Sequence, residues 1–171
     1  ITVAGLLGSV AGAAALLRRD IAVGDVVVAQ RNVQLRVGNE LVGDVAQGDA
    51  LRVKSVQGDW LWVTKGTSGW IRRADVVPVE RMLEVYSATI SRNPANVDAW
   101  HRRAELYHEL GDLNRAIADY SEAIRRSDDD PTLYSNRGMA YSDRGDLDQD
   151  IADFGRAIEL RPLDPAPYNN R

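Results

Sequence analysis

The chain has 171 residues, which is enough for one or two domains, and its formal net charge is −4. It contains no Cys, so disulfides, thiol nucleophiles and Cys-ligated metal sites are excluded. Residues 1–80 carry 9 basic and 8 acidic side chains, whereas residues 81–171 carry 12 and 17. The acidic second half argues against nucleic acid as a partner and favours basic or polar partners.

The chain begins with an apolar segment, which we assign to residues 1–20. Ile1 to Leu17 holds no charged residue, and Arg18-Arg19-Asp20 follow it. This pattern predicts an export signal or a membrane anchor, and hence an exported or membrane-tethered protein, with a cytoplasmic location as the alternative. A buried N-terminal helix of a soluble domain is the competing interpretation.

Residues 21–79 have the pattern of a small all-β domain. Short apolar runs alternate with Gly-Asp and Gly-Asn pairs. Many short strands joined by such turns indicate a small antiparallel barrel. The runs expected to form strands are Val26-Val27-Val28, Val33/Leu35/Val37, Leu41-Val42, Leu51/Val53, Leu61/Val63, Trp70-Ile71 and Val76-Val77.

Two segments of this domain carry a family resemblance, Gly58-Asp59-Trp60-Leu61-Trp62-Val63 and Gly69-Trp70-Ile71. They resemble the SH3-like barrel, particularly its bacterial form. The resemblance implies binding of peptides, cell-wall material or neighbouring domains, and it places the predicted export in a bacterial cell envelope. We do not expect recognition of proline-rich peptides, because Arg72 and Asp75 stand where the domains that bind them have a proline and a tyrosine.

Trp60 and Trp62 share one face of a predicted strand, because side chains alternate along a strand. As a binding surface they would stack on a ligand. The competing interpretation packs one ring at the edge of the barrel core and the other against the junction with a helix at Glu80.

Residues 97–130 and 131–164 are two copies of one 34-residue unit. Each copy holds two apolar patterns of helical period, separated by Gly111-Asp112 in the first and by Gly145-Asp146 in the second. Gly takes the left-handed conformation that ends a helix, and Asp caps the helix that follows. A fixed period of this length is typical of a solenoid. The matching positions include Trp100 and Tyr134, Arg103 and Arg137, Tyr107 and Tyr141, Tyr120 and Phe154, and Ala123-Ile124 and Ala157-Ile158.

The unit resembles the tetratricopeptide repeat (TPR), whose antiparallel helix pairs stack into an all-α solenoid. The small residues Ala104 and Gly138 would let paired helices approach closely. Two positions depart from the pattern. Asp150 stands where the first copy has Ala116, and Asp128 stands where the second copy has Pro162. Both changes would loosen local packing without changing the fold.

The same 34-residue phase extends beyond the two copies. Residues 80–96 match the second helix of a repeat and are predicted to join the barrel to the solenoid. Residues 165–171 match the start of a third repeat. Since a solenoid needs about three or more units, we expect a longer array. The predicted fold class is therefore α+β multidomain, with a small all-β SH3-like barrel followed by an all-α TPR solenoid.

Polar side chains on the first helix of each repeat form the candidate ligand-binding groove, because the resemblance implies that these helices line the concave face. A polar groove of mixed charge suits an extended peptide held by hydrogen bonds. Asn136 is the first candidate, since an Asn bonds both the N–H and the C=O of a bound strand, and Arg102 is the next. A solvated surface kept soluble by charge is the competing interpretation. The candidate residues are Asn136, Arg102, His101, Glu105, Ser135, Met139 and Asn170.

Catalysis is not expected, because the sequence shows no phosphate loop, nucleophile elbow or paired-carboxylate motif. His101 and Glu105 have metal-ligand spacing, but His108 lies about 10 Å further along the helix, and two ligands do not make a site. We therefore expect no enzyme activity, no cofactor and no metal. The predicted function is a scaffold whose groove binds a protein or peptide partner. The alternatives are a cell-envelope binding module acting through the barrel, and a non-catalytic region of a larger enzyme.

Overall fold

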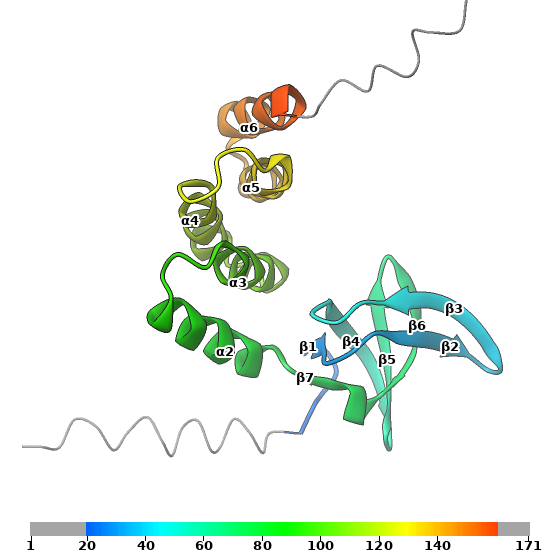
Figure 1. Ribbon diagram of the computed structural model, residues 1–171. Coiled ribbons are helices and arrows are strands. Elements are labelled where there is room, and N and C mark those ends of the chain that lie inside the picture. Colours follow the sequence, from blue (N-terminus) through cyan, green and yellow to red (C-terminus); the bar gives the residue numbers. More distant parts are fainter. Residues whose placement is uncertain (1–19, 161–171) are drawn as a thin grey trace, which may run out of the picture. The chain divides into compact units, whose positions relative to one another are not determined.

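The computed structural model describes residues 20–160 (Figure 1). The chain divides into two compact units, Ile1–Val85 and Tyr86–Arg171. An antiparallel sheet forms the first unit and helices form the second, which confirms the predicted fold class. The predicted signal or anchor and the start of the third repeat lie outside the described residues. Within residues 20–160, no helix combines the length and apolar character needed to cross a membrane.

One antiparallel sheet of seven strands makes up the described part of the first unit, in the order β3-β2-β6-β5-β4-β1-β7. Every apolar run expected to form a strand lies within one of these strands. This architecture is consistent with the expected SH3-like barrel. The strands are β1 (Val26–Ala29), β2 (Val33–Val37), β3 (Glu40–Val45), β4 (Ala50–Gln57), β5 (Trp60–Lys65), β6 (Thr67–Arg72) and β7 (Val76–Pro78), with a short helix η1 (Arg73–Asp75) before β7.

The core of the sheet unit is aliphatic. Leu61, Val63 and Ile71 point inward and are at most 1% exposed, so their neighbours along β5 and β6 point outward. Gly69 allows β2 to approach β6, because a Cβ at this position would lie 2.7 Å from the Cβ of Leu35. The outer faces of β2, β6 and β5 are therefore held side by side.

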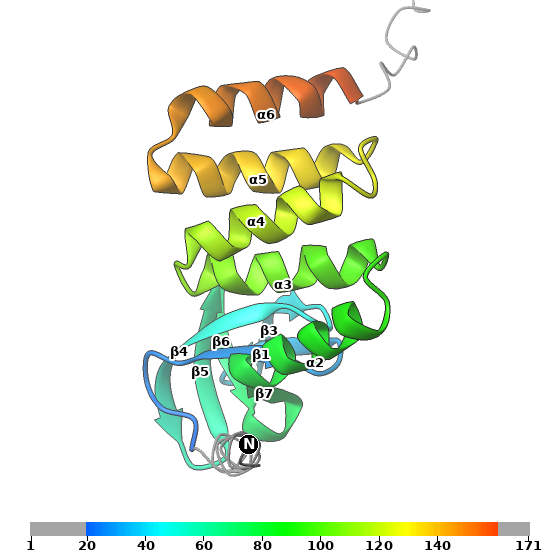
Figure 2. The same ribbon diagram turned by 90° about the vertical axis from the view of Figure 1, so that its left-hand side faces the viewer.

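The helices after the sheet form the described part of the repeats. Helix α4 packs against both α3 and α5, and α6 packs against α5 (Figure 2). Asn96, Asp112 and Asp130 cap the N-termini of α3, α4 and α5 by accepting hydrogen bonds from backbone N–H groups. The helices are α2 (Val79–Arg92), α3 (Val97–Glu109), α4 (Leu113–Ile124), α5 (Pro131–Arg144) and α6 (Leu147–Leu160).

Small residues set the close spacing within each helix pair, as predicted. Ala104 and Ala116 are fully buried between α3 and α4. A Cβ on Gly138 of α5 would lie 3.4 Å from Asp153 and Phe154 of α6. At the departure from the repeat pattern, Oδ1 of Asp150 is buried and has no hydrogen-bond partner within residues 20–160. The carboxylate therefore carries a desolvation cost that Ala116 avoids in the first copy.

Arginines at equivalent positions of the two copies each join three consecutive helices. Arg103 of α3 donates from Nε and Nη2 to the carboxylate of Asp119 on α4, at 2.7 and 2.9 Å. Its Nη1 donates to Oγ of Ser87 on α2 at 3.0 Å. Both aspartates that accept such bonds are buried, with at most 6% of their surface exposed. The second copy repeats the contacts at Arg137, Asp153 and Ser121.

Candidate functional site

The α3–α5 face holds most of the predicted groove residues. We use this name for the side chains of His101, Arg102, Glu105 and Asn136 and for those that contact them. Helix α3 approaches α5 directly, since both pack on α4. Nδ2 of Asn136 lies 2.8 Å from Nε2 of His101, so the amide donates to the ring nitrogen and links the two helices.

His101 packs against the hydrophobic core of the repeats. Its ring centroid lies 5.9 Å from that of Tyr120, a side chain that is 1% exposed. Burial raises the pKa of Tyr120, and the nearby carboxylates of Glu105 and Glu109 raise it further. The phenol therefore stays neutral, and its buried ring packs against the imidazole and limits its movement.

Carboxylates surround Arg102 on the same face. Its Nη1 donates to Oε2 of Glu105 at 3.1 Å, and its Nε lies 3.5 Å from Oδ1 of Asp98. Burial lowers the pKa of Arg102, but Glu105 and Asp98 outweigh this effect, so the net pKa is raised. Tyr86 of α2 neighbours this group, and burial raises its pKa. Tyr86 was not among the predicted groove residues, although its position in the 34-residue phase places it on a repeat helix.

A second link joins α3 to α5 about two helical turns from the first. Nε2 of His108 lies 2.7 Å from Oδ2 of Asp143. Sequence reasoning considered His108 only as a metal ligand and missed this contact. We include the His108–Asp143 pair in the α3–α5 face. The charges on this face are mainly acidic, because Asp98, Glu105 and Asp143 outnumber Arg102.

The remaining groove candidates are Met139, Ser135 and Asn170. Met139 is 44% exposed and Ser135 is half-buried, both on α5. Asn170 lies outside the described residues. The structure therefore brings together His101, Arg102 and Glu105 with Asn136, while Ser135 and Met139 add surface to α5.

The two barrel tryptophans lie on the outer face of β5, as their spacing predicts. Trp60 is 37% exposed, and the guanidinium carbon of Arg72 lies 5.2 Å from its ring centroid. Trp62 is half-buried and meets Trp70 of β6 edge to face, with 5.3 Å between ring centroids. Both rings therefore face away from the aliphatic core.

Family models now identify the helical part of the chain. A TPR repeat model matches residues 104–145, and tetratricopeptide repeat models match residues 85–118 and 131–162. Residues 85–162 are tetratricopeptide repeats. Modules of this family are generally non-catalytic, and the TPR match supports a role in protein–protein interaction.

Solved structures are similar to about half of the chain. The second TPR of Spaghetti (RPAP3) bound to the HSP90 peptide SRMEEVD is 26% identical, covers 48% of this chain and 77% of its own, and has a TM-score of 0.47. The first TPR of Spaghetti, bound to the same peptide, is 24% identical, covers 53% and 72%, and has a TM-score of 0.48. A crystal structure of MamA is 22% identical, covers 54% and 50%, and has a TM-score of 0.48.

The chain spans about half the length of the MamA structures that it matches. No curated protein sequence matches it.

Proposed function

We propose that the TPR region holds an extended segment of a partner protein against the α3–α5 face. The observation that carries this proposal is the Asn136–His101 contact, which fixes a polar side chain between the first helices of two successive repeats. The Asn136 amide retains its oxygen and a second N–H, and it has no other partner within residues 20–160. These groups suit the backbone of an extended peptide.

The charge on the face indicates which segment would fit. Asp98 is mainly exposed, with 76% of its side chain accessible, and Asp143 has 62% accessible. Exposed carboxylates at both ends of the face attract Lys and Arg side chains at moderate salt. The proposed partner segment is therefore polar or basic.

A differential capture experiment tests the proposal. The wild-type chain and the Asn136→Ala variant are used as baits in lysate of the host, and bound proteins are identified by mass spectrometry. We expect the variant to lose a discrete partner while its helical circular dichroism is unchanged. The matched control, Asn114→Ala, removes the same side-chain type at an exposed position of α4, and it should retain the partner.

A peptide array separates the charge preference from binding itself. Basic, neutral and acidic decapeptides are compared at low and high salt. Basic peptides should bind best and weaken as salt rises. Equal binding of both baits to all partners would contradict the assignment to this face, whereas a preference for acidic peptides would contradict only the predicted partner charge.

A further inference from the structure

A second binding surface lies on the sheet unit, on the outer faces of β2, β6 and β5. We call it the Trp-Arg face and define it by Arg36, Trp60, Trp62, Trp70 and Arg72. Strand register places these side chains in two adjacent rows, because Trp70 pairs with both Arg36 and Trp62, and Arg72 pairs with Trp60. The residues between them on β5 and β6 are buried, as is Leu35 before Arg36 on β2, so all five project to the same side.

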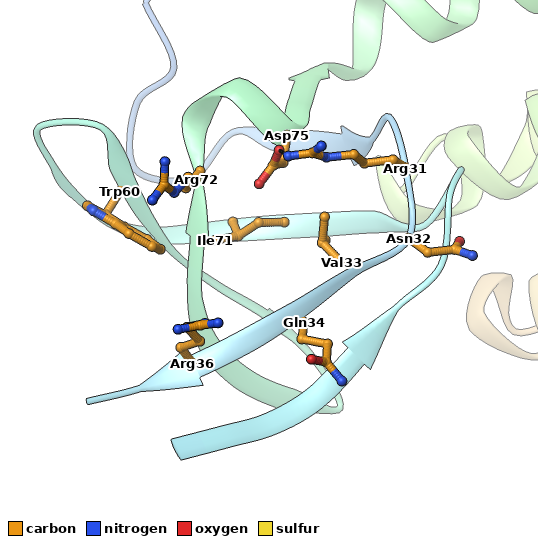
Figure 3. Close-up of a pocket in the computed structure, with 9 residues that line it drawn as sticks. All are labelled: Arg31, Asn32, Val33, Gln34, Arg36, Trp60, Ile71, Arg72 and Asp75. Atoms are coloured by element: carbon orange, nitrogen blue, oxygen red, sulfur yellow. Dashed lines mark hydrogen bonds and ion pairs between the residues drawn. The ribbon is translucent and has the colours of Figure 1, made fainter. Parts of the chain in front are cut away.

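Two hollows adjoin on this face. The larger has a volume of about 470 Å³, and Figure 3 shows Arg36, Arg72 and Trp60 around it, with Asn32 and Gln34 toward the opposite end. The smaller has a volume of about 370 Å³ and reaches Trp70. Arg36 and Trp60 line both hollows, which makes the two a continuous site. These volumes are typical of sites that hold small ligands or short peptide segments.

The arginines that line the larger hollow differ in whether a carboxylate neutralises them. Arg31 forms an ion pair with Asp75, whose side chain is only 9% exposed, so this cation is already neutralised. Arg36 and Arg72 have no carboxylate partner within residues 20–160. Arg72 instead lies over the Trp60 ring, which orients its guanidinium without removing its charge. The hollow therefore presents two uncompensated guanidinium groups beside an exposed aromatic ring.

We propose that the Trp-Arg face binds an acidic peptide segment. Guanidinium groups bind carboxylates through paired, charge-assisted hydrogen bonds, and the indole of Trp60 offers a flat surface for the aliphatic or peptide part of the same segment. Gln34 already donates to Asp44 at 3.0 Å, so its amide oxygen remains to accept a bond from the ligand backbone. This site and its ligand charge differ from those proposed for the α3–α5 face.

Charge also argues against nucleic acid as the occupant. The first unit, residues 1–85, carries 10 basic and 9 acidic side chains. Affinity for a nucleic acid strand grows with the number of phosphates neutralised, and two free arginines neutralise few. A short acidic segment needs only such a local pair of cations.

Fluorescence anisotropy with a labelled hexaglutamate peptide tests the proposal on the full chain. Hexaglutamine and an oligothymidylate of equal length are the comparison probes. We expect hexaglutamate to bind, hexaglutamine to bind more weakly, and Arg36→Gln/Arg72→Gln to raise the hexaglutamate Kd by about tenfold or more. The matched control, Lys54→Gln/Arg81→Gln, removes two exposed positive charges from outside the hollows and should change the Kd by less than about twofold.

A second measurement does not depend on the variants. The Trp60 indole N–H resonance should shift on titration of wild-type protein with hexaglutamate and should stay fixed with hexaglutamine. The proposal is overturned if hexaglutamate does not bind, if both double variants weaken it equally, or if the oligothymidylate binds more tightly. An unmoved Trp60 resonance despite binding would also overturn it, since the ligand would then occupy another surface.

Discussion

At the scale of single residues, Arg137 shows how one side chain holds several helices together. Its guanidinium contacts Asp153 twice at 2.7 Å and Ser121 at 3.0 Å, and it lies 5.8 Å from the ring centroids of both Tyr134 and Tyr141. Hydrogen bonds to Asp153 raise the pKa of Arg137 despite its burial. The planar fork of donors satisfies a buried carboxylate that would otherwise be costly.

Replacing Arg137 with Lys should therefore destabilise the repeats although the charge is retained. A single ammonium cannot make the paired bonds to Asp153 and reach Ser121, so we expect the free energy of unfolding to fall by about 2 kcal/mol or more. Urea unfolding followed by circular dichroism at 222 nm measures the change. The control is Arg156→Lys, because the Arg156–Glu159 pair is exposed at 46% and 69% and its substitution should change the free energy of unfolding far less. Equal effects of the two substitutions would refute this role of Arg137.

At the scale of helices, two glycines have different backbone roles, because Gly145 ends one helix and Gly155 lies inside the next. Gly145 is the C-cap of α5 with φ of 90°, a left-handed conformation that L-residues with a Cβ rarely adopt. Gly155 lies within α6 on an exposed position, where a Cβ would meet nothing within 4 Å. The same substitution should consequently have opposite signs at the two sites.

Gly145→Ala should lower the free energy of unfolding by about 1–2 kcal/mol, because Ala pays the left-handed strain. Gly155→Ala should raise it by about 0.5–1 kcal/mol, because Ala has the higher helix propensity. Parallel thermal and urea unfolding of both variants provides the measurement, and each variant is the control for the other. Shifts of the same sign would show that backbone conformation does not decide the effect of Ala on stability at these two positions.

The sequence predicted the helices well because their signals are local. Gly111 and Gly145 end helices with positive φ, and Asp112 and Asp130 cap the following ones, as short-range patterns indicate. The Arg137–Asp153 pair was not predicted, although the matching positions of Arg103 and Arg137 were recognised. Residues sixteen apart meet only once antiparallel packing is fixed, and no local period encodes that.

The same reason explains which residues of the two surfaces could be predicted from the sequence. His101, Arg102 and Glu105 share one helix face by periodicity, but the links to Asn136 and from His108 to Asp143 depend on how α3 approaches α5. On the sheet, alternation placed Trp60 and Trp62 correctly. Arg36 joins them only through strand order, in which β2 lies beside β6 rather than beside β5.

At the scale of the whole described molecule, one apolar face stands out as uncovered. In the first copy, Ile117 and Ile124 of α4 are 7% and 8% exposed because α5 packs over them. Their equivalents on α6, Ile151 and Ile158, are 71% and 69% exposed. In the first copy, Leu133 and Tyr134, at the start of α5, form one cluster with Ala123 and Ile124. The first turn of the following helix therefore covers the isoleucine nearer the C-terminus of α4.

Residues 165–171 are predicted to begin a third repeat, and the 34-residue phase places Pro167 and Tyr168 at the positions of Leu133 and Tyr134. A third-repeat helix with the packing of the first copy would cover Ile158 and leave Ile151 exposed. An isoleucine on an open helix surface changes to Ala with little cost, since Ala is the better helix former. A covered isoleucine loses apolar burial and leaves a cavity.

We accordingly expect Ile158→Ala to lower the free energy of unfolding by about 1–2 kcal/mol, which is less than the cost at a fully buried isoleucine. Ile151→Ala should change it by less than about 0.5 kcal/mol. Ile124→Ala, at the equivalent buried position, is the reference variant and should lower the free energy of unfolding by about 2–4 kcal/mol. Deleting residues 161–171 should abolish the cost of Ile158→Ala while leaving that of Ile124→Ala intact. A neutral Ile158→Ala in the undeleted chain would mean that these terminal residues do not pack on α6, and the apolar face would then have to be covered by another molecule or remain open to solvent.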